Sequence, residues 1–319
     1  MKLTDKQIKD FVYTFKLPIS VLREKYFDYY VELLDPYYNV KKKLEVYKSA
    51  LKNSDEDGTL RKNNLHVHLI REIKGKKDFL KFSESEKINN LIQGQVYIPH
   101  LEVYQRDHSG KYFISVDLNK ANFQCLKYFG FDLFNGKSSF EDFIDSYTDE
   151  EILKESKILR QVVFGSLNPK RQQGMQKSMM MKICEIIKVS ELFSKELNIH
   201  SMSSDEIYFE AKKEDFEKTK ILTQMLNNND FDVRVEHFKL HAPFIKPGYY
   251  KEFTDGSAKS INLVPKDKLC QFIKLIENKP FDERDFLFCG SDGELSKHME
   301  VFYEFLPEKQ TFKKRLKNI

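Results

Sequence analysis

Two acidic positions that lie far apart in the sequence could share one metal site. Asp117 ends an aromatic and β-branched segment, and the adjacent acids Asp205 and Glu206 occupy a short polar turn between two apolar segments. The first pattern is typical of a strand and the second of a β-hairpin. Carboxylates brought together by one sheet can hold two divalent cations roughly 3.5–4 Å apart, which supports phosphoryl transfer. An aspartate after a strand is about as often a helix N-cap.

A row of basic residues lies between these acids. Thr148 and Glu151 have the spacing of a capping box, which predicts a helix that carries Lys154, Lys157 and Arg160 three residues apart. Such a stripe could grip the phosphates of a nucleoside triphosphate, because phosphoryl transfer depends mainly on positioning and charge neutralisation. For any single group of cations, a solvated helix face is the more common role. The order of strand acid, basic helix and hairpin acids is what favours a site.

Helical and strand patterns alternate around these residues, which predicts an α+β protein. Apolar spacing predicts helices over most of residues 1–82, and polarity predicts a linker at 83–90. Further expectations are short strands at 65–70, 96–98, 101–104 and 111–117, a helix over 171–197, a hairpin over 198–210, a helix over 213–226 and a strand over 233–240. No pattern indicates a role for residues 245–319.

The composition excludes a secreted disulfide scaffold, a zinc ribbon and a membrane protein. The chain has 319 residues, with 53 Lys and Arg against 49 Asp and Glu, and its 40% hydrophobic residues suffice to bury a core. No segment approaches the length of a membrane span, and the N-terminus has no signal-peptide core. Four scattered cysteines without a CxxC pair indicate free thiols in a reducing compartment. We therefore expect a cytoplasmic protein, cellular or viral, without membrane association.

The acid-bearing segments resemble two motifs of family A DNA polymerases. Residues 110–123 (GKYFISVDLNKANF) look like motif A, in which a strand ends at a metal-binding aspartate. Residues 204–211 (SDEIYFEA) are similar to motif C, His-Asp-Glu-Leu-Val-Phe-Glu. Residues 160–165 (RQVVFG) resemble the Lys-x-x-x-Phe-Gly of the fingers helix, and Gln173 with the next glycine resembles the Gln-Gly of the following helix. The resemblance covers roughly residues 95–240.

The resemblance implies a right-hand polymerase-like fold without an exonuclease domain. An antiparallel-sheet palm with compact helical fingers (about 118–197) would occupy residues 95–244, after a helical thumb-like region at 1–94. Residues 245–319 would form a C-terminal extension. The implied activity is template-directed addition of nucleotides to a 3′-hydroxyl with release of pyrophosphate. Its implied cofactors are two Mg²⁺ or Mn²⁺ ions, and its implied partners are primer–template nucleic acid and nucleoside triphosphates.

The resemblance also implies roles for individual residues. Asp117 and Asp205 would be the metal ligands, with Glu206 as an accessory catalytic carboxylate. Implied contacts with the incoming nucleotide come from Lys157, Arg160, Phe164 and Asn122. Implied contacts with the nucleic acid come from Gln172, Gln173 and Lys177.

Three departures from the family pattern bear on activity. Ser204 replaces the histidine of motif C, and Asn122 and Asn168 replace the glutamate and tyrosine that help to exclude a 2′-hydroxyl. Ribonucleotide use therefore stays open. An alternative alignment to the Lys-x-x-x-Asn-Ser-x-Tyr-Gly motif of family B polymerases would make Lys157 the triphosphate residue. Against it, Ser203 stands where that family has its first motif C aspartate.

Three functions are compatible with these patterns. The first is a polymerase-like nucleotidyltransferase. The second is a catalytically inactive, palm-shaped replication accessory protein that binds nucleic acid, which the departures favour. The third is a metal-dependent nuclease that uses the same acids, although it gives the cationic helix no role. The sequence does not indicate whether the template is DNA or RNA, or whether a primer is needed.

Overall fold

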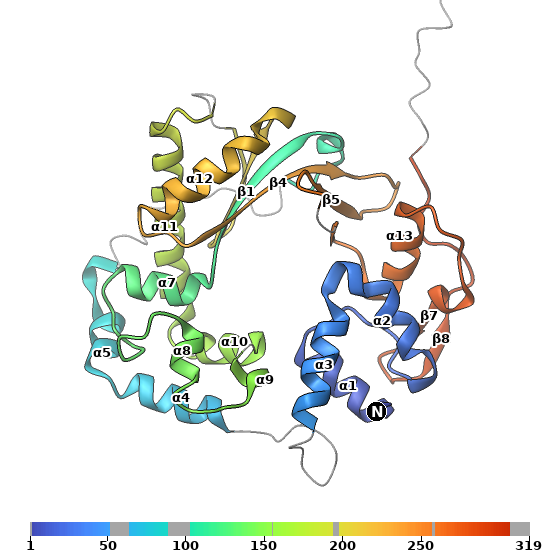
Figure 1. The fold of residues 1–319 in the computed structure, drawn as a ribbon, viewed down its shortest axis with the longest axis horizontal. Helices are drawn as coiled ribbons and strands as arrows, with labels where there is room; N and C mark the ends of the chain where they lie inside the picture. The colour runs from blue at the N-terminus through green and yellow to red at the C-terminus, as the bar shows by residue number, and fades with distance from the viewer. Residues whose placement is uncertain are drawn as a thin grey trace, which may run out of the picture.

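An antiparallel sheet of six strands lies across the upper part of the protein in the view of Figure 1, with groups of helices below it on both sides. The structure is a computed structural model of the 319-residue chain, and it describes residues 2–51, 64–88, 103–154, 156–193, 198–256 and 259–306. The strands follow the spatial order β2-β3-β1-β4-β5-β6. Their bounds are β1 (Tyr112–Leu118), β2 (Ile199–Met202), β3 (Glu206–Ala211), β4 (Val233–His241), β5 (Tyr249–Phe253) and β6 (Ser260–Asn262).

The first four strands and the helices between them follow a β-α-β-β-α-β order. Strand β1 lies between β3 and β4 and is antiparallel to both, so the hairpin β2–β3 packs on one side of it and β4 on the other. This is the split β-α-β arrangement of ferredoxin-like sheets. The α+β class with an antiparallel sheet is confirmed, as are the strand over 111–117, the hairpin and the strand over 233–240.

One face of this sheet is apolar and covered by helices. Ile114 and Val116 of β1 and Phe209 of β3 are fully buried in the main hydrophobic cluster, which also includes residues of the covering helices. Figure 1 shows α11 and α12 lying on this side of β1 and β4. Because side chains alternate along a strand, Ser115 and Asp117 project from the opposite face. The covering helices are α7 (Ala121–Tyr128), α11 (Pro169–Val189) and α12 (Lys218–Asn227), the last preceded by the 3-10 helix η3 (Lys213–Glu217).

The helices inserted between β1 and β2 pack with two helices from the N-terminal third. Leu69, Ile73 and Phe82 join the same hydrophobic cluster as Phe134 and Phe164 of the insertion. The helices concerned are α4 (Leu65–Lys74), α5 (Lys77–Glu84), α8 (Phe140–Ile144), α9 (Glu151–Lys154) and α10 (Lys157–Gly165).

The strand expected at 65–70 is wrong, because this segment lies in helix α4. Leu65, Val67 and Leu69 alternate in the sequence, yet Val67 is 54% exposed. The buried residues are Leu65, Leu69 and Ile73, four positions apart, which is the helical rather than the strand period. Residues beyond the short alternating run therefore decide the structure.

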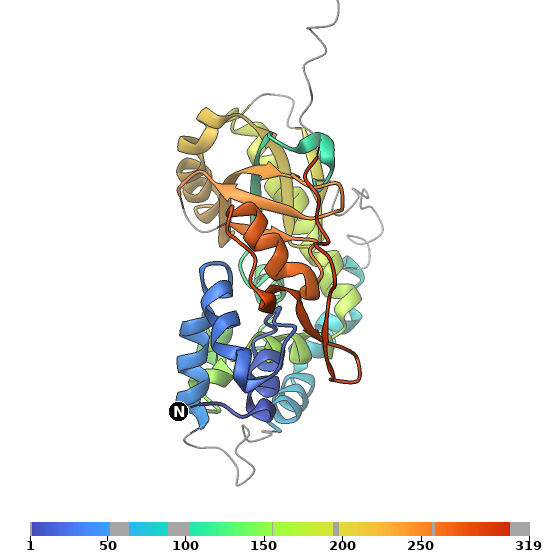
Figure 2. The same ribbon diagram turned by 90° about the vertical axis from the view of Figure 1, so that its right-hand side faces the viewer.

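The N-terminal helices pack with the C-terminal part of the chain. Figures 1 and 2 show α1–α3 beside α13, β7 and β8. The phenol of Tyr30 donates to the carbonyl of Arg284 (2.6 Å), and the amide of Cys289 donates to the carbonyl of Ser20 (2.8 Å). The elements are α1 (Asp5–Thr14), α2 (Glu24–Tyr38), α3 (Val40–Ala50), α13 (Leu269–Ile276), β7 (Leu287–Cys289) and β8 (Leu295–Lys297). Three 3-10 helices, η2 (Arg106–His108), η4 (Lys266–Lys268) and η5 (Glu283–Phe286), lie in connecting segments.

Packing divides the N-terminal region differently from the expected unit at 1–94. Helices α1–α3 belong to one hydrophobic cluster, whereas α4 and α5 belong to that of the sheet. Residues 83–84 of the expected linker lie in α5, and the helix expected to reach 197 ends at Val189. The strand expected at 96–98 and the first half of the one at 101–104 lie outside the described residues; Val103 and Tyr104 are not in a strand.

Two expectations concern the chain as a whole. The four cysteines are free thiols, and all but Cys289 are buried. In the part of the chain that the structure describes, no helix combines the length and the apolar character needed to cross a membrane.

Candidate active site

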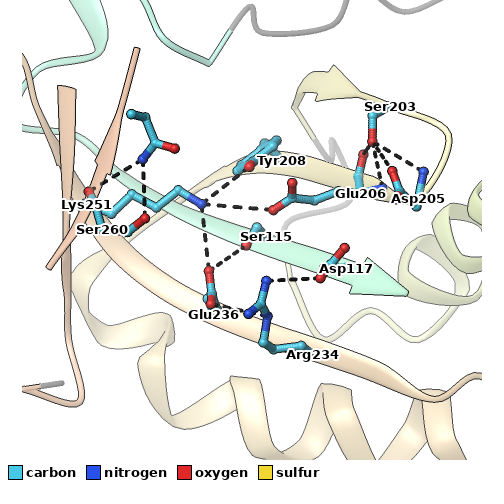
Figure 3. A network of polar contacts seen from close by, with 11 residues as sticks. Ser115, Asp117, Ser203, Asp205, Glu206, Tyr208, Arg234, Glu236, Lys251 and Ser260 are labelled. Atoms are coloured by element: carbon cyan, nitrogen blue, oxygen red, sulfur yellow. Dashed lines mark hydrogen bonds and ion pairs between the residues drawn. The ribbon is translucent and has the colours of Figure 1, made fainter. Parts of the chain in front are cut away.

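Asp117 and Glu206 lie directly opposite each other on neighbouring strands. The register of β1 with β3 pairs Asp117 with Glu206, and the register of β1 with β4 pairs Asp117 with Arg234. Side chains of directly opposed residues project from the same face of an antiparallel sheet. All three therefore lie on the face that α11 and α12 leave uncovered (Figure 3).

Asp205 lies beside this pair, in the turn that joins β2 to β3. Its carbonyl accepts the amide of Leu118 (2.8 Å), which fixes the turn next to the end of β1. Its carboxylate accepts the hydroxyl of Ser203 at 2.9 Å and that of Ser204 at 3.4 Å. Ser204, which replaces the expected histidine, therefore contacts the acid directly. The fold thus brings Asp205 next to the end of the strand that carries Asp117.

A chain of alternating charges runs from Asp117 across this face (Figure 3). Asp117 accepts from Arg234 (3.0 Å), and Arg234 also pairs with Glu236 (3.3 Å). Glu236 lies 3.7 Å from the ammonium group of Lys251, which lies 4.0 Å from Glu206. The network of charges thus runs from Asp117 to Glu206, the residue paired with Asp117 on the neighbouring strand.

Lys251 is the buried cation of this network. Its side chain is only 6% exposed, donates to the hydroxyl of Tyr208 (3.3 Å) and lies over the rings of Tyr208 and Phe238. Burial lowers the pKa of Lys251, and the nearby Glu206 and Glu236 act in the opposite direction. The pKa of Tyr208 is raised, first by burial and then by the charge of Glu206.

Asp117 has a pKa of about 6, raised above the usual value of 3.8. Burial is the largest cause, and the charges of Glu206, Asp205 and Glu236 raise the pKa further. Arg234 acts against them. A bound cation would stabilise the ionised form of Asp117, because it would offset the repulsion from the other carboxylates and the loss of hydration.

The raised pKa of Asp117 predicts a pH-dependent cost in stability. Folding favours the protonated carboxyl, so the wild type loses stability as pH rises from 3.8 to about 6. We expect Asp117→Asn to exceed the wild type in free energy of unfolding by about 2–3 kcal/mol above pH 7, and to match it below pH 4. Urea denaturation of both proteins between about pH 3 and pH 8 measures this difference.

Removal of the exposed Asp107 serves as the control for this experiment. Asp107→Asn removes a surface charge from the turn before β1 without touching the network. A difference between Asp117→Asn and the wild type that stays constant over the pH range would contradict the raised pKa.

The basic stripe of the insertion is divided between two helices. Ser156 caps α10 by accepting the amide of Leu159, so the helix expected to start at the Thr148 capping box is broken before Lys157. Lys154 remains on α9 and pairs with Asp145 (3.0 Å). The expectation of one continuous stripe is therefore wrong for Lys154.

The two cations of α10 are placed differently from each other. Arg160 lies 3.7 Å from Glu141, which also pairs with Lys120 in the turn after β1. This link ties the guanidinium to the segment that follows Asp117. Lys157 is exposed, and its charge lowers the pKa of Lys43 on α3 in addition to the larger effect of burial. Lys157 of α10 and Lys43 of α3 are therefore close enough for their charges to repel each other.

Two of the expected ligand contacts are buried within the protein. Phe164 is 2% exposed and packs against Phe134 and Phe140. Gln172 is 1% exposed, and its amide donates to the carbonyls of Phe164 and Leu167. In this structure both side chains hold the α10–α11 connection together rather than line a surface that a base or a backbone could reach.

The remaining expected residues lie along α7 and α11. Asn122 accepts a hydrogen bond from the amide of Gln176 (2.6 Å), which links the two helices. Gln173 is exposed and Lys177 is half-buried. Gln176 was not among the expected site residues, although its spacing of one helical turn from Gln172 could have indicated it.

Asp117 and Asp205 are the residues that could hold a divalent cation together with the phosphates of a substrate. Among the described residues, no three His, Cys, Asp or Glu side chains converge to hold an ion. Mg²⁺ in nucleotide-processing sites is commonly bound through one or two carboxylates together with substrate phosphates. Asp117 and Asp205 supply hard oxygen ligands of that kind and number. The described residues give no comparable support for an ion held by protein side chains alone.

Arg234, Glu236 and Lys251 were missed as site residues. The strand that carries the first two was expected, but nothing local marks which of its residues face the acids. Lys251 follows two tyrosines in an aromatic strand, which is a weak sign of a buried cation. Comparison of the chain with protein-family models, curated proteins and solved structures found no match.

Proposed function

We propose that this protein is a template-directed nucleotidyltransferase that extends a 3′-hydroxyl and releases pyrophosphate. The 3′-oxygen attacks the α-phosphorus of a nucleoside triphosphate, the bond to the pyrophosphate oxygen breaks, and the hydroxyl proton passes to solvent. The observation that carries the proposal is the position of Asp117 near the end of β1, beside the β2–β3 turn that carries Asp205, with a helical insertion between the two acids in sequence.

Individual residues would have the following roles in this reaction. Asp117 and Asp205 would hold Mg²⁺, which when bound would neutralise triphosphate charge and favour ionisation of the attacking hydroxyl. Arg160 and Lys157 of α10 would contact the triphosphate. The resemblance to palm, fingers and motif C of family A polymerases supports this assignment, and the β-α-β-β-α-β sheet is compatible with such a palm.

The alternative is a palm-shaped protein that binds nucleic acid without catalysis. Two observations favour it: the carboxylate of Asp117 is already paired with Arg234, and no third ligand converges on the acids within the described ranges. A nuclease has no comparable support, because it leaves the cations of α10 without a role.

Incorporation assays test the proposal directly. Purified protein is given 5′-labelled primers on DNA and RNA templates, and unprimed templates, with each set of dNTPs or rNTPs and Mg²⁺. We expect lengthening of the labelled strand by the nucleotide complementary to the template. A chelator such as EDTA should abolish lengthening, and added Mg²⁺ should restore it.

The other outcomes separate the alternatives. Binding of primer–template without incorporation of any nucleotide would support the accessory protein. Shortening of the labelled strand without addition would support the nuclease. Addition that ignores the template sequence would contradict the template-directed part of the proposal.

A further inference from the structure

Arg234 is bound at the same time by two carboxylates that differ in their surroundings. One nitrogen of its guanidinium donates to Asp117 (3.0 Å), and its Nε lies 3.3 Å from Glu236. The side chain of Arg234 is 59% exposed, whereas those of Asp117 and Glu236 are 25% and 20% exposed. The arginine thus covers the acid from the solvent side of the sheet.

Of the two carboxylates, Glu236 has the additional partners of opposite charge or hydrogen-bonding character. Glu236 accepts the hydroxyl of Ser115 (3.4 Å) and lies 3.7 Å from the buried ammonium of Lys251. Asp117 ends its strand and faces Glu206, another carboxylate, across the sheet. The guanidinium of Arg234 can therefore separate from Asp117 while it stays paired with Glu236.

We infer that Arg234 is a built-in counter-ion that occupies the carboxylate of Asp117 until a divalent cation displaces it. This inference rests on the proposed role of Asp117 as a metal ligand. A cation bound by Asp117 competes with the guanidinium for the same oxygens. Arg234 then remains on Glu236, one strand away, so that displacement requires only a side-chain movement. The arginine is a positioning residue, because it acts through Asp117.

Mn²⁺ binding to the free protein tests the inference without any measurement of activity. Mn²⁺ affinity is measured at pH 8 by titration calorimetry for the wild type, Arg234→Gln, Arg234→Lys and Lys239→Gln. Lys239 lies on the same strand β4 but is paired in register with Tyr112, so it projects from the opposite face. Lys239→Gln therefore removes the same charge without releasing Asp117.

Arg234→Gln should bind Mn²⁺ about three- to fivefold more tightly than Lys239→Gln, because an exposed arginine–carboxylate pair no longer has to be broken. Arg234→Lys should lie between Arg234→Gln and the wild type, since a single ammonium group cannot bridge both acids as the guanidinium does. Equal affinities of Arg234→Gln and Lys239→Gln would overturn the inference.

Asp117→Asn separates failure of the inference from failure of the proposed function. If Asp117→Asn loses Mn²⁺ binding while Arg234→Gln gains nothing, the inference is wrong and the metal site stands. If Asp117→Asn binds Mn²⁺ as the wild type does, both the inference and the proposed metal site are wrong. Thermal melts of every variant show whether the fold is intact.

Discussion

Asp205→Asn should lose at least about a thousandfold in kcat/KM for nucleotide incorporation, or roughly 4 kcal/mol of transition-state stabilisation. Asparagine has the shape of aspartate and its side-chain oxygen can still accept the hydroxyl of Ser203, which is 2.9 Å away in the wild type. The backbone contact of residue 205 with Leu118 does not involve the side chain. The loss would therefore reflect the missing charge rather than a changed turn.

Matched substitutions make this result specific. Asp107→Asn removes an exposed carboxylate from the turn before β1 and should leave incorporation unchanged. Glu206→Gln should lower kcat/KM less than Asp205→Asn does. The carboxylate of Glu206 lies 4.0 Å from the ammonium group of Lys251, so it is already paired within the protein. Equal primer extension by Asp205→Asn and the wild type would exclude the metal role of Asp205, or identify the activity as that of a contaminant.

Lys251→Met should lower the free energy of unfolding by about 2–3 kcal/mol, because it leaves the partly buried Glu206 without its cation and removes one of the two cations beside Glu236. Glu206 and Glu236 are 22% and 20% exposed, so water screens them in part and the cost falls below that of a fully buried pair. Methionine fills a similar volume between the rings of Tyr208 and Phe238. Chemical denaturation at pH 7 measures the effect.

A double variant identifies the cause. Adding Glu206→Gln to Lys251→Met removes the carboxylate that has lost its cation, and it should recover part of the loss. Lys239→Met, on the other face of β4, should change the free energy of unfolding by about 0.5 kcal/mol or less. A loss that Glu206→Gln does not reduce would indicate a packing defect.

Local pattern predicted the elements that hold the two acids. Four of the five residues before Asp117 are β-branched or aromatic, and the turn at Asp205 stands between two apolar strands. Such segments strongly favour the strand conformation, so β1, the β2–β3 hairpin and β4 can be predicted from short stretches of sequence. Short patterns failed where their period was ambiguous, as at residues 65–70.

The charge network could not be predicted in the same way. Its members come from β1, β3, β4 and β5, and they meet because of the registers between these strands. A shift of one residue in any register would turn Arg234 or Lys251 to the other face. Tertiary contacts likewise decide that Phe164 and Gln172 are buried, although their positions in the sequence suggested ligand contacts.

The dependence of the first three helices on the last third of the chain has a consequence for biosynthesis. Their hydrophobic cluster includes Leu269, Cys270 and Ile273, and their polar contacts include Arg284 and Cys289. A ribosome delivers these partners last. Residues near Asp117 and Asp205 can thus settle into their sheet while the earliest-made helices still lack part of their core. Helices α1–α3, although synthesised first, should be among the last parts of the protein to become fully protected from proteases.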